Sequence, residues 1–147
     1  MIPIGSDLSP KNPLQLVQED ESTLLGDPRF EAAVAHFNDS DWYPCHDEFE
    51  MLWHETQGPL RPVLQALLQI AVAHIHLERG NLKGATVLLG EGLGRLAPCG
   101  EAALGIDLAV LRKSVAARLN ALQLGEPSDL LPPPRLLAQA PPQPPVD

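Results

Sequence analysis

Apolar residues recur at helical spacing through most of the chain, and turn residues divide this pattern into five segments. Each segment opens with a capping residue or a proline and closes at a glycine, an asparagine or a proline. The pattern predicts helices over residues 28–38, 42–57, 59–79, 82–97 and 108–124. Because the connections are short, neighbouring helices are expected to run antiparallel. The predicted fold class is therefore all-α, a single compact bundle of about five antiparallel helices.

The two ends of the chain lack this pattern. Residues 1–26 mix prolines with an acidic run and show no sustained period, so we predict an irregular, poorly structured acidic arm. Residues 126–147 hold eight of the sixteen prolines and are expected to be extended rather than helical. This proline-rich tail is either flexible, or its leucine pairs at 130–131 and 136–137 pack on the domain or on a partner. The predicted bundle domain spans residues 27–125.

The segment 59–79 is apolar nearly all round, which is typical of a central helix. Its polar exceptions Gln65, Gln69 and His76 share one narrow stripe and need partners if they are enclosed. The segment 82–97 instead carries four glycines, each costing about 1 kcal/mol relative to alanine inside a helix. Their presence predicts a close approach to a neighbouring helix.

Composition narrows the classes of function. Nineteen acidic and ten basic residues give a formal net charge of −9, which disfavours binding to nucleic acid and to anionic membrane surfaces. The chain has no apolar run long enough to span a bilayer and no signal-peptide pattern at its start, so we expect a soluble cytoplasmic protein. Cys45 and Cys99 are far apart in the sequence and are predicted to be reduced.

Candidate chemistry is concentrated in the stretch DWYPCHDEFEMLWHE, residues 41–55. His46 and Glu50 lie four residues apart on the margin of the apolar arc of this predicted helix, next to Trp53. A carboxylate beside an imidazole suits proton transfer, and with His76 as a third ligand the pair could hold Zn²⁺ or Fe²⁺. A purely structural hydrogen bond is the competing interpretation, because this spacing is common on helices.

The other notable side chains have simpler interpretations. Trp42, Phe49, Leu52 and Trp53 are expected in the core. His74 is expected to be a core histidine with Glu78 as its partner. We expect the remaining polar residues to face solvent, namely His36, Asp47, Glu48, His54 and Glu55.

The runs FNDSDWYPCHDEFEMLWHE and LLQIAVAHIHLERGNLKGATVLL resemble the DUF309 family of small all-helical proteins, over about residues 30–96. The resembling motifs are H-x-x-x-E-x-x-W and H-x-x-R-G-N-x-x-G-A. The resemblance implies a multi-helix bundle and no established activity or cofactor, with Arg79 pairing with a carboxylate of the preceding acidic helix. The positions that it marks are His46, Glu50, Trp53, Gln69, His76, Arg79, Asn81 and Gly84.

Three functional hypotheses remain open. In the first, His46, Glu50 and His76 form a pocket walled by Trp42 and Trp53 that binds a small ligand or a divalent metal. In the second, the helical hairpins, which resemble a tetratricopeptide hairpin, form an interaction or scaffold module. Its partner would bind the proline-rich tail or an apolar groove, and a second copy of the chain is a further candidate. In the third and weakest, His46 is the base and Glu50 its orienting group in a hydrolase-type enzyme.

Overall fold

The computed structural model describes residue 10 and residues 12–139 of the chain. Within these residues the chain forms helices and one short hairpin in the following order: α1 (Pro13–Leu25), α2 (Pro28–Asn38), α3 (Trp42–Glu55), α4 (Arg61–Glu78), α5 (Leu82–Leu96), a 3₁₀ turn η1 (Ala97–Cys99), β1 (Ala102–Ala103), β2 (Ile106–Asp107) and α6 (Leu108–Gln123). The all-α class and the five predicted helices are confirmed, with ends that differ by no more than about two residues.

The capping chemistry explains why these helices begin and end where they do. The side chains of Asp27, Asn81 and Asp107 accept hydrogen bonds from backbone N–H groups in the first turns of α2, α5 and α6. Gly80 follows α4 and Gly125 follows α6, both with positive φ, which glycine adopts at least cost. Asp41 precedes α3 without a side-chain bond.

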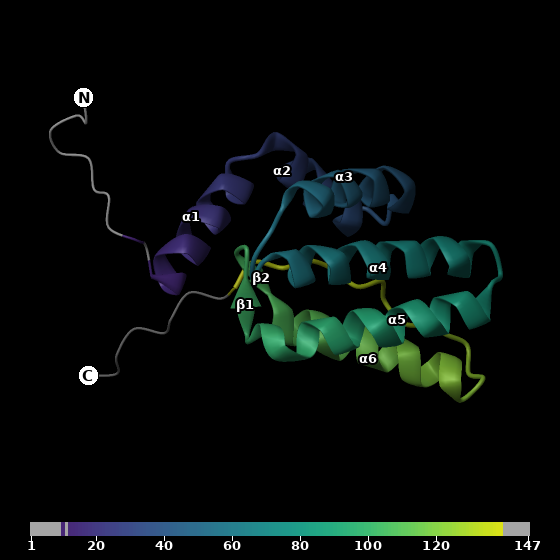
Figure 1. Ribbon diagram of the computed structural model, residues 1–147. Coiled ribbons are helices and arrows are strands. Elements are labelled where there is room, and N and C mark those ends of the chain that lie inside the picture. The colour runs from purple at the N-terminus through teal and green to yellow at the C-terminus, as the bar shows by residue number, and fades with distance from the viewer. Residues whose placement is uncertain (1–9, 11, 140–147) are drawn as a thin grey trace, which may run out of the picture.

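The helices are arranged around α4. The α2–α3 pair covers one side of α4, and α5 and α6 lie on the other side (Figure 1). Ten of the eighteen α4 residues are buried, as the all-round apolar pattern predicted: Val63, Leu64, Ala66, Leu67, Leu68, Ile70, Ala71, Ala73, His74 and Ile75. Among the described helices, none has the length and hydropathy needed to cross a bilayer.

Helix α1 lies where the sequence predicted a poorly structured arm, so that prediction was wrong for residues 13–25. Asn12 and Gln15 form a reciprocal capping box, and Pro13 occupies the first turn, where a proline favours helix initiation. Pro13, one of the prolines of the predicted irregular arm, is therefore a start signal for a helix. Leu24 joins the core near the end of α1, and the rest of α1 projects from the bundle (Figure 1). The first nine residues of the predicted arm lie outside the described residues.

The β-hairpin was not predicted. Ala102 lies opposite Asp107 and Ala103 opposite Ile106 in an antiparallel pair. The two residues of the turn, Leu104 and Gly105, both have positive φ, as a tight type I′ hairpin turn requires. Leucine is unusual at such a position, but the Leu104 side chain is buried in the core, which compensates for the strained backbone.

The glycines of α5 differ in what surrounds them. A Cβ atom at Gly92 would lie 3.1 Å from the Ile70 side chain and 3.4 Å from the Ala66 carbonyl oxygen of α4. At Gly90 and Gly94 it would meet nothing within 4 Å, and at Gly84 it would meet the capping side chain Asn81. The predicted close helix contact is therefore found at Gly92, whereas the prediction was wrong for Gly84, Gly90 and Gly94.

This difference predicts a contrast between two substitutions. Gly90→Ala should raise the free energy of unfolding by up to about 1 kcal/mol, because alanine has the higher helix propensity and the space is open. Gly92→Ala should raise it less or lower it, because the new methyl group must displace Ile70. Urea denaturation of both variants measures the difference, and equal stabilisation by the two would contradict the packing described for Gly92.

Candidate functional site

His46 and Glu50 form a close ionisable pair on α3. His46 Nε2 lies 2.9 Å from Glu50 Oε2, and His46 Nδ1 lies 3.2 Å from Asp47 Oδ1. The side chain of His46 is 30% exposed and that of Glu50 is 44% exposed. The pair therefore lies at the surface, beside a buried arc of α3 that contains Cys45, Phe49 and Leu52.

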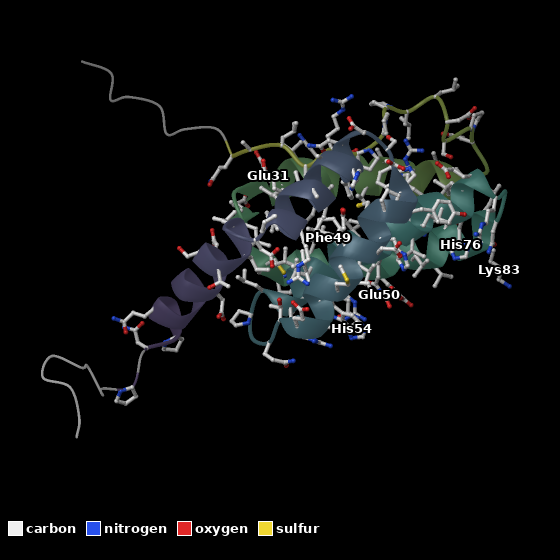
Figure 2. The ribbon with its side chains drawn as sticks, turned by 90° about the horizontal axis from the view of Figure 1, so that it is seen from above. Glu31, Phe49, Glu50, His54, His76 and Lys83 are labelled. Atoms are coloured by element: carbon white, nitrogen blue, oxygen red, sulfur yellow. The ribbon has the colours of Figure 1, made fainter. Side chains whose placement is uncertain are left out.

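His54 lies one helical turn beyond Glu50 on α3. His54 Nε2 lies 3.7 Å from the other oxygen of Glu50, so one carboxylate lies between two imidazole rings on the outer side of α3. Figure 2 shows Glu50 and His54 next to each other on this side of the molecule. His54 is exposed, as the sequence predicted.

His76 binds a different partner. Its Nδ1 atom accepts a hydrogen bond from the Asn81 side-chain amide at 3.0 Å, and the Asn81 backbone N–H donates to the His76 carbonyl oxygen at 2.8 Å. His76 thus stabilises the turn between α4 and α5. No group of three or more His, Cys, Asp or Glu side chains in the described part of the chain is placed to hold a metal ion. His46, Glu50 and His76 accordingly do not form such a group.

Arg79 contacts an aromatic residue rather than a carboxylate. Its Nε donates to the Tyr43 hydroxyl at 2.9 Å, and its guanidinium carbon lies 5.5 Å from the centre of the Tyr43 ring. The resemblance had implied that Arg79 pairs with a carboxylate of α3. In the structure its partner on α3 is Tyr43 instead. The contact joins the start of α3 to the end of α4, as expected for antiparallel neighbours.

Gln69 links α4 to α5. Its side-chain amide donates to Glu91 at 2.9 Å and its oxygen accepts from Arg95 Nε at 2.9 Å. Gln69 and His76, two of the three residues of the polar stripe of α4, therefore have hydrogen-bond partners.

Trp53 lies at the other end of α3 and is packed against the core. The guanidinium of Arg61 lies 4.4 Å from the centre of its ring and donates to the Trp53 carbonyl oxygen. The indole Nε1 of Trp53 is buried and has no hydrogen-bond partner among the described residues. Trp53 thus holds the start of α4 against α3.

His74 is a core histidine, but its partner is not Glu78. Its Nδ1 donates to the Ile70 carbonyl oxygen at 2.7 Å, and its ring stacks on Trp42 with centroids 4.3 Å apart. Its Nε2 atom is buried without a partner among the residues described. The pKa of His74 is lowered to about 4, mainly by burial. The positive charge of Arg118 also lowers this pKa, whereas the hydrogen bond to the Ile70 carbonyl raises it. His74 is therefore neutral near pH 7.

Two residues that we expected to face solvent form an ion pair instead. His36 Nδ1 on α2 lies 2.8 Å from Glu48 Oε2 on α3, with side-chain exposures of 33% and 20%. The hydrogen bond that the His36 ring donates to the Glu48 carboxylate raises the pKa of His36. Glu55 likewise binds Arg29, whose guanidinium also binds Asp27. These pairs join α2 to α3.

The cysteines are not activated. Cys45 is buried and Cys99 partly so, and burial raises the pKa of both thiols. A low thiolate fraction makes them poor nucleophiles.

A hollow of about 580 Å³ lies beside α6 and the β-hairpin, where Leu93, Val110 and Lys113 line it. None of the residues that the sequence analysis proposed as site residues lines this hollow. The proposed residues instead fall into separate pairs along the surfaces of α3, α4 and α5.

Comparison with known protein families gives a match over the helices that carry the candidate site. Residues 30–88 match the model of DUF309, a domain of unknown function. This part of the chain is a DUF309 domain. It covers most of α2, all of α3 and α4 and the first half of α5, and it contains all six proposed residues: His46, Glu50, Trp53, Gln69, His76 and Arg79. The rest of α5, the β-hairpin, α6 and the tail lie outside the matched residues. The chain matches no curated protein and no solved structure.

Two residues that were not predicted as functional organise the surroundings of the DUF309 domain. Asn38, at the end of α2, and Arg118, on α6, both bind the backbone of the tail. Asn38 gave no signal beyond a helix end. Arg118 did give one, because it lies three residues after the buried Val115 and its charge interrupts the apolar stripe of α6.

The buried His74 predicts a particular dependence of stability on pH. The unfolded chain binds a proton near the ordinary pKa of 6.5, whereas the folded chain binds it only near pH 4. The contribution of His74 to stability is therefore complete above about pH 6.5 and falls by about 2–3 kcal/mol as the pH decreases to 4. His74→Phe should remove this loss, as measured by urea denaturation across that range.

His54→Phe is the matched control, because the His54 side chain is 62% exposed. His36 acts with the opposite sign, since its raised pKa stabilises the fold at low pH and the effect disappears as the pH rises. If His74→Phe kept the same loss of stability towards pH 4, the burial of a neutral His74 would be contradicted.

Proposed function

We propose that this chain is a protein-interaction module that docks a partner on the outer face of α3. This outer face consists of Tyr43, Asp47, Glu50, Met51 and His54. The observation that carries the proposal is the exposure of two large apolar side chains two helical turns apart, Tyr43 at 48% and Met51 at 47%. Aromatic residues and methionine are enriched at the centre of protein interfaces, where they provide most of the contact area.

The charge of the outer face specifies the chemistry of the partner. Helix α3 contains Asp47, Glu48, Glu50 and Glu55 and no lysine or arginine. A partner that covers Tyr43 and Met51 must also meet the carboxylates of Asp47 and Glu50. An amphipathic helix with lysine or arginine beside its apolar stripe satisfies both requirements. Methionine suits this role because its flexible side chain adapts to different apolar surfaces.

The aromatic anchor is held in place before a partner arrives. Arg79 binds the Tyr43 hydroxyl and lies over its ring, so the ring loses little freedom on binding. Arg79, one of the positions marked by the DUF309 resemblance, thereby supports this interaction surface. The pocket hypothesis needs His46, Glu50 and His76 to face one cavity, whereas these side chains are paired on α3 and in the α4–α5 turn. The observations therefore favour the interaction module.

A pair of synthetic peptides tests the proposal. One is a labelled lysine- and leucine-containing amphipathic helix, and the other has the same composition in a scrambled order without an apolar face. The amphipathic peptide should bind the full chain more tightly in fluorescence anisotropy, and its binding should weaken with added salt. Met51→Asp should remove the difference between the peptides by placing a charge in the apolar contact.

Val110→Asp is the control for this substitution, because Val110 on α6 is also exposed, at 42%, and receives the same charge. Equal binding of the two peptides would contradict the proposal. An equal loss with Met51→Asp and Val110→Asp would also contradict it, because the outer face of α3 would then have no special role.

A further inference from the structure

The tail returns along the bundle as an extended strap, which we define as residues 128–139. It runs from the end of α6 back to the β-hairpin (Figure 1). The sequence left open whether the tail is flexible or packs on the domain, and in the described residues it packs. Residues 140–147 lie outside the described residues.

The bundle holds the strap mainly by its backbone. The Asn38 side chain donates to the Leu136 carbonyl oxygen at 3.0 Å and accepts from the Leu136 N–H at 2.6 Å. One amide group thus satisfies both backbone groups of one residue, as a neighbouring β-strand would. The backbone N–H of Asp107 donates to Leu137 at 2.8 Å, and Gln139 donates to Gly105 at 3.2 Å. The end of the strap therefore pairs with β2 through an antiparallel β-bridge between Ala138 and Ile106.

Arg118 holds the beginning of the strap. Its guanidinium donates to the carbonyl oxygens of Ser128, Leu131 and Pro132, each at 3.1 Å. Only 6% of Arg118 is exposed, and burial lowers its pKa. A buried guanidinium needs hydrogen-bond acceptors, and the strap carbonyls supply them to both terminal nitrogens. The Nε atom of Arg118 is buried without a partner among the described residues.

Two strap side chains enter the domain at alternate positions. Pro134 and Leu136 are buried, whereas Arg135 and Leu137 are exposed. Leu136 belongs to the hydrophobic core and is 4% exposed. The strap thus presents the pattern Pro-x-Leu to the bundle, and the residue between these two, Arg135, is exposed.

These contacts define a ligand by its conformation and by two side chains. Asn38, Arg118 and β2 bind backbone groups that every extended peptide possesses. We propose that the strap site is a peptide-binding site that also takes an extended Pro-x-Leu segment of another protein in place of the strap. The strap is then the resident occupant, and a partner segment competes with it.

The surroundings of the strap allow such an exchange. Residues 124–127, which connect α6 to the strap, are exposed, and Gly125 has a positive φ of 70°. A hollow of about 390 Å³ lies between α6 and Leu131–Pro132, and another of about 420 Å³ lies beside Pro127–Asp129. The strap is therefore not closely covered along its first half. The site lies away from the outer face of α3, so the two proposals do not depend on each other.

Cutting the connection tests whether the strap is a ligand. A protease recognition sequence is inserted between Gly125 and Glu126 of the full chain, and the purified protein is cut. The released peptide should co-elute with the bundle in gel filtration. A labelled peptide of residues 126–139 should replace it, as measured by fluorescence anisotropy. Separation of the bundle and the peptide after cutting, or failure of the labelled peptide to bind, would overturn the proposal.

Peptide variants test the recognition without changing the bundle. A peptide with Leu136→Asp should bind at least about tenfold more weakly, because a charge would enter the core. Leu137→Asp is the control at the exposed neighbouring position and should bind like the parent peptide. An alanine-based peptide with proline and leucine at these two positions should bind, and the same peptide with the two exchanged should not. Equal affinities within either pair would overturn the Pro-x-Leu assignment.

Bundle variants and the uncut chain complete the test. Asn38→Ala should weaken binding of the parent peptide about tenfold by removing two backbone contacts, whereas Asn120→Ala, on the exposed side of α6, should not.

The uncut chain should bind the peptide more weakly, because its own strap competes. If uncut tagged and untagged chains instead exchange straps and form mixed dimers, the occupant is a second copy, and the assignment to another protein is overturned.

Discussion

The structure depends on one constraint, which is that α4 is apolar nearly all round and must be covered on almost every side. Its ten buried residues include no charged side chain, and His74 is the single titratable one. Helix α3 covers it on one side and α5 on the other, and α5 approaches closely at Gly92. Burial of this apolar surface is the dominant favourable contribution to the fold. The remaining elements complete the cover that α4 requires.

The polar positions marked by the DUF309 resemblance follow from the same constraint. Where α4 is left partly uncovered, its stripe carries Gln69 and His76, and each of them binds a residue from α5 or from the turn before it. Arg79 and Tyr43 close the end of the α3–α4 seam. Gln69, His76 and Arg79 therefore each bind a local partner near the surface, on or beside the elements next to α4.

The sequence predicted what periodicity and caps encode. The five helices, their caps at Asp27, Asn81 and Asp107 and the central position of α4 all follow from local residue patterns. Helix α1 was missed because Pro13 can start a helix as well as break one. The hairpin was missed because Leu104 occupies a turn position that its own residue type disfavours, and only its burial in the core explains the choice.

The candidate site was less predictable, for a physical reason. Spacing on a single helix predicts which residues are neighbours, and His46 does pair with Glu50. It does not give the rotation of one helix against the next, so it could not tell that His76 would bind Asn81 or that His36 would meet Glu48. The strap depends on contacts between residues about a hundred positions apart, such as Asn38 and Leu136. No local pattern encodes those contacts.

Amide hydrogen exchange tests the central role of α4 most directly. If the fold is organised around this helix, its amides from Leu64 to Ile75 should exchange only through global unfolding. Their opening free energy should then equal the free energy of unfolding measured with denaturant. The projecting part of α1 should exchange much faster. Exchange of the α4 amides through local openings, at rates similar to those of α1, would contradict the account.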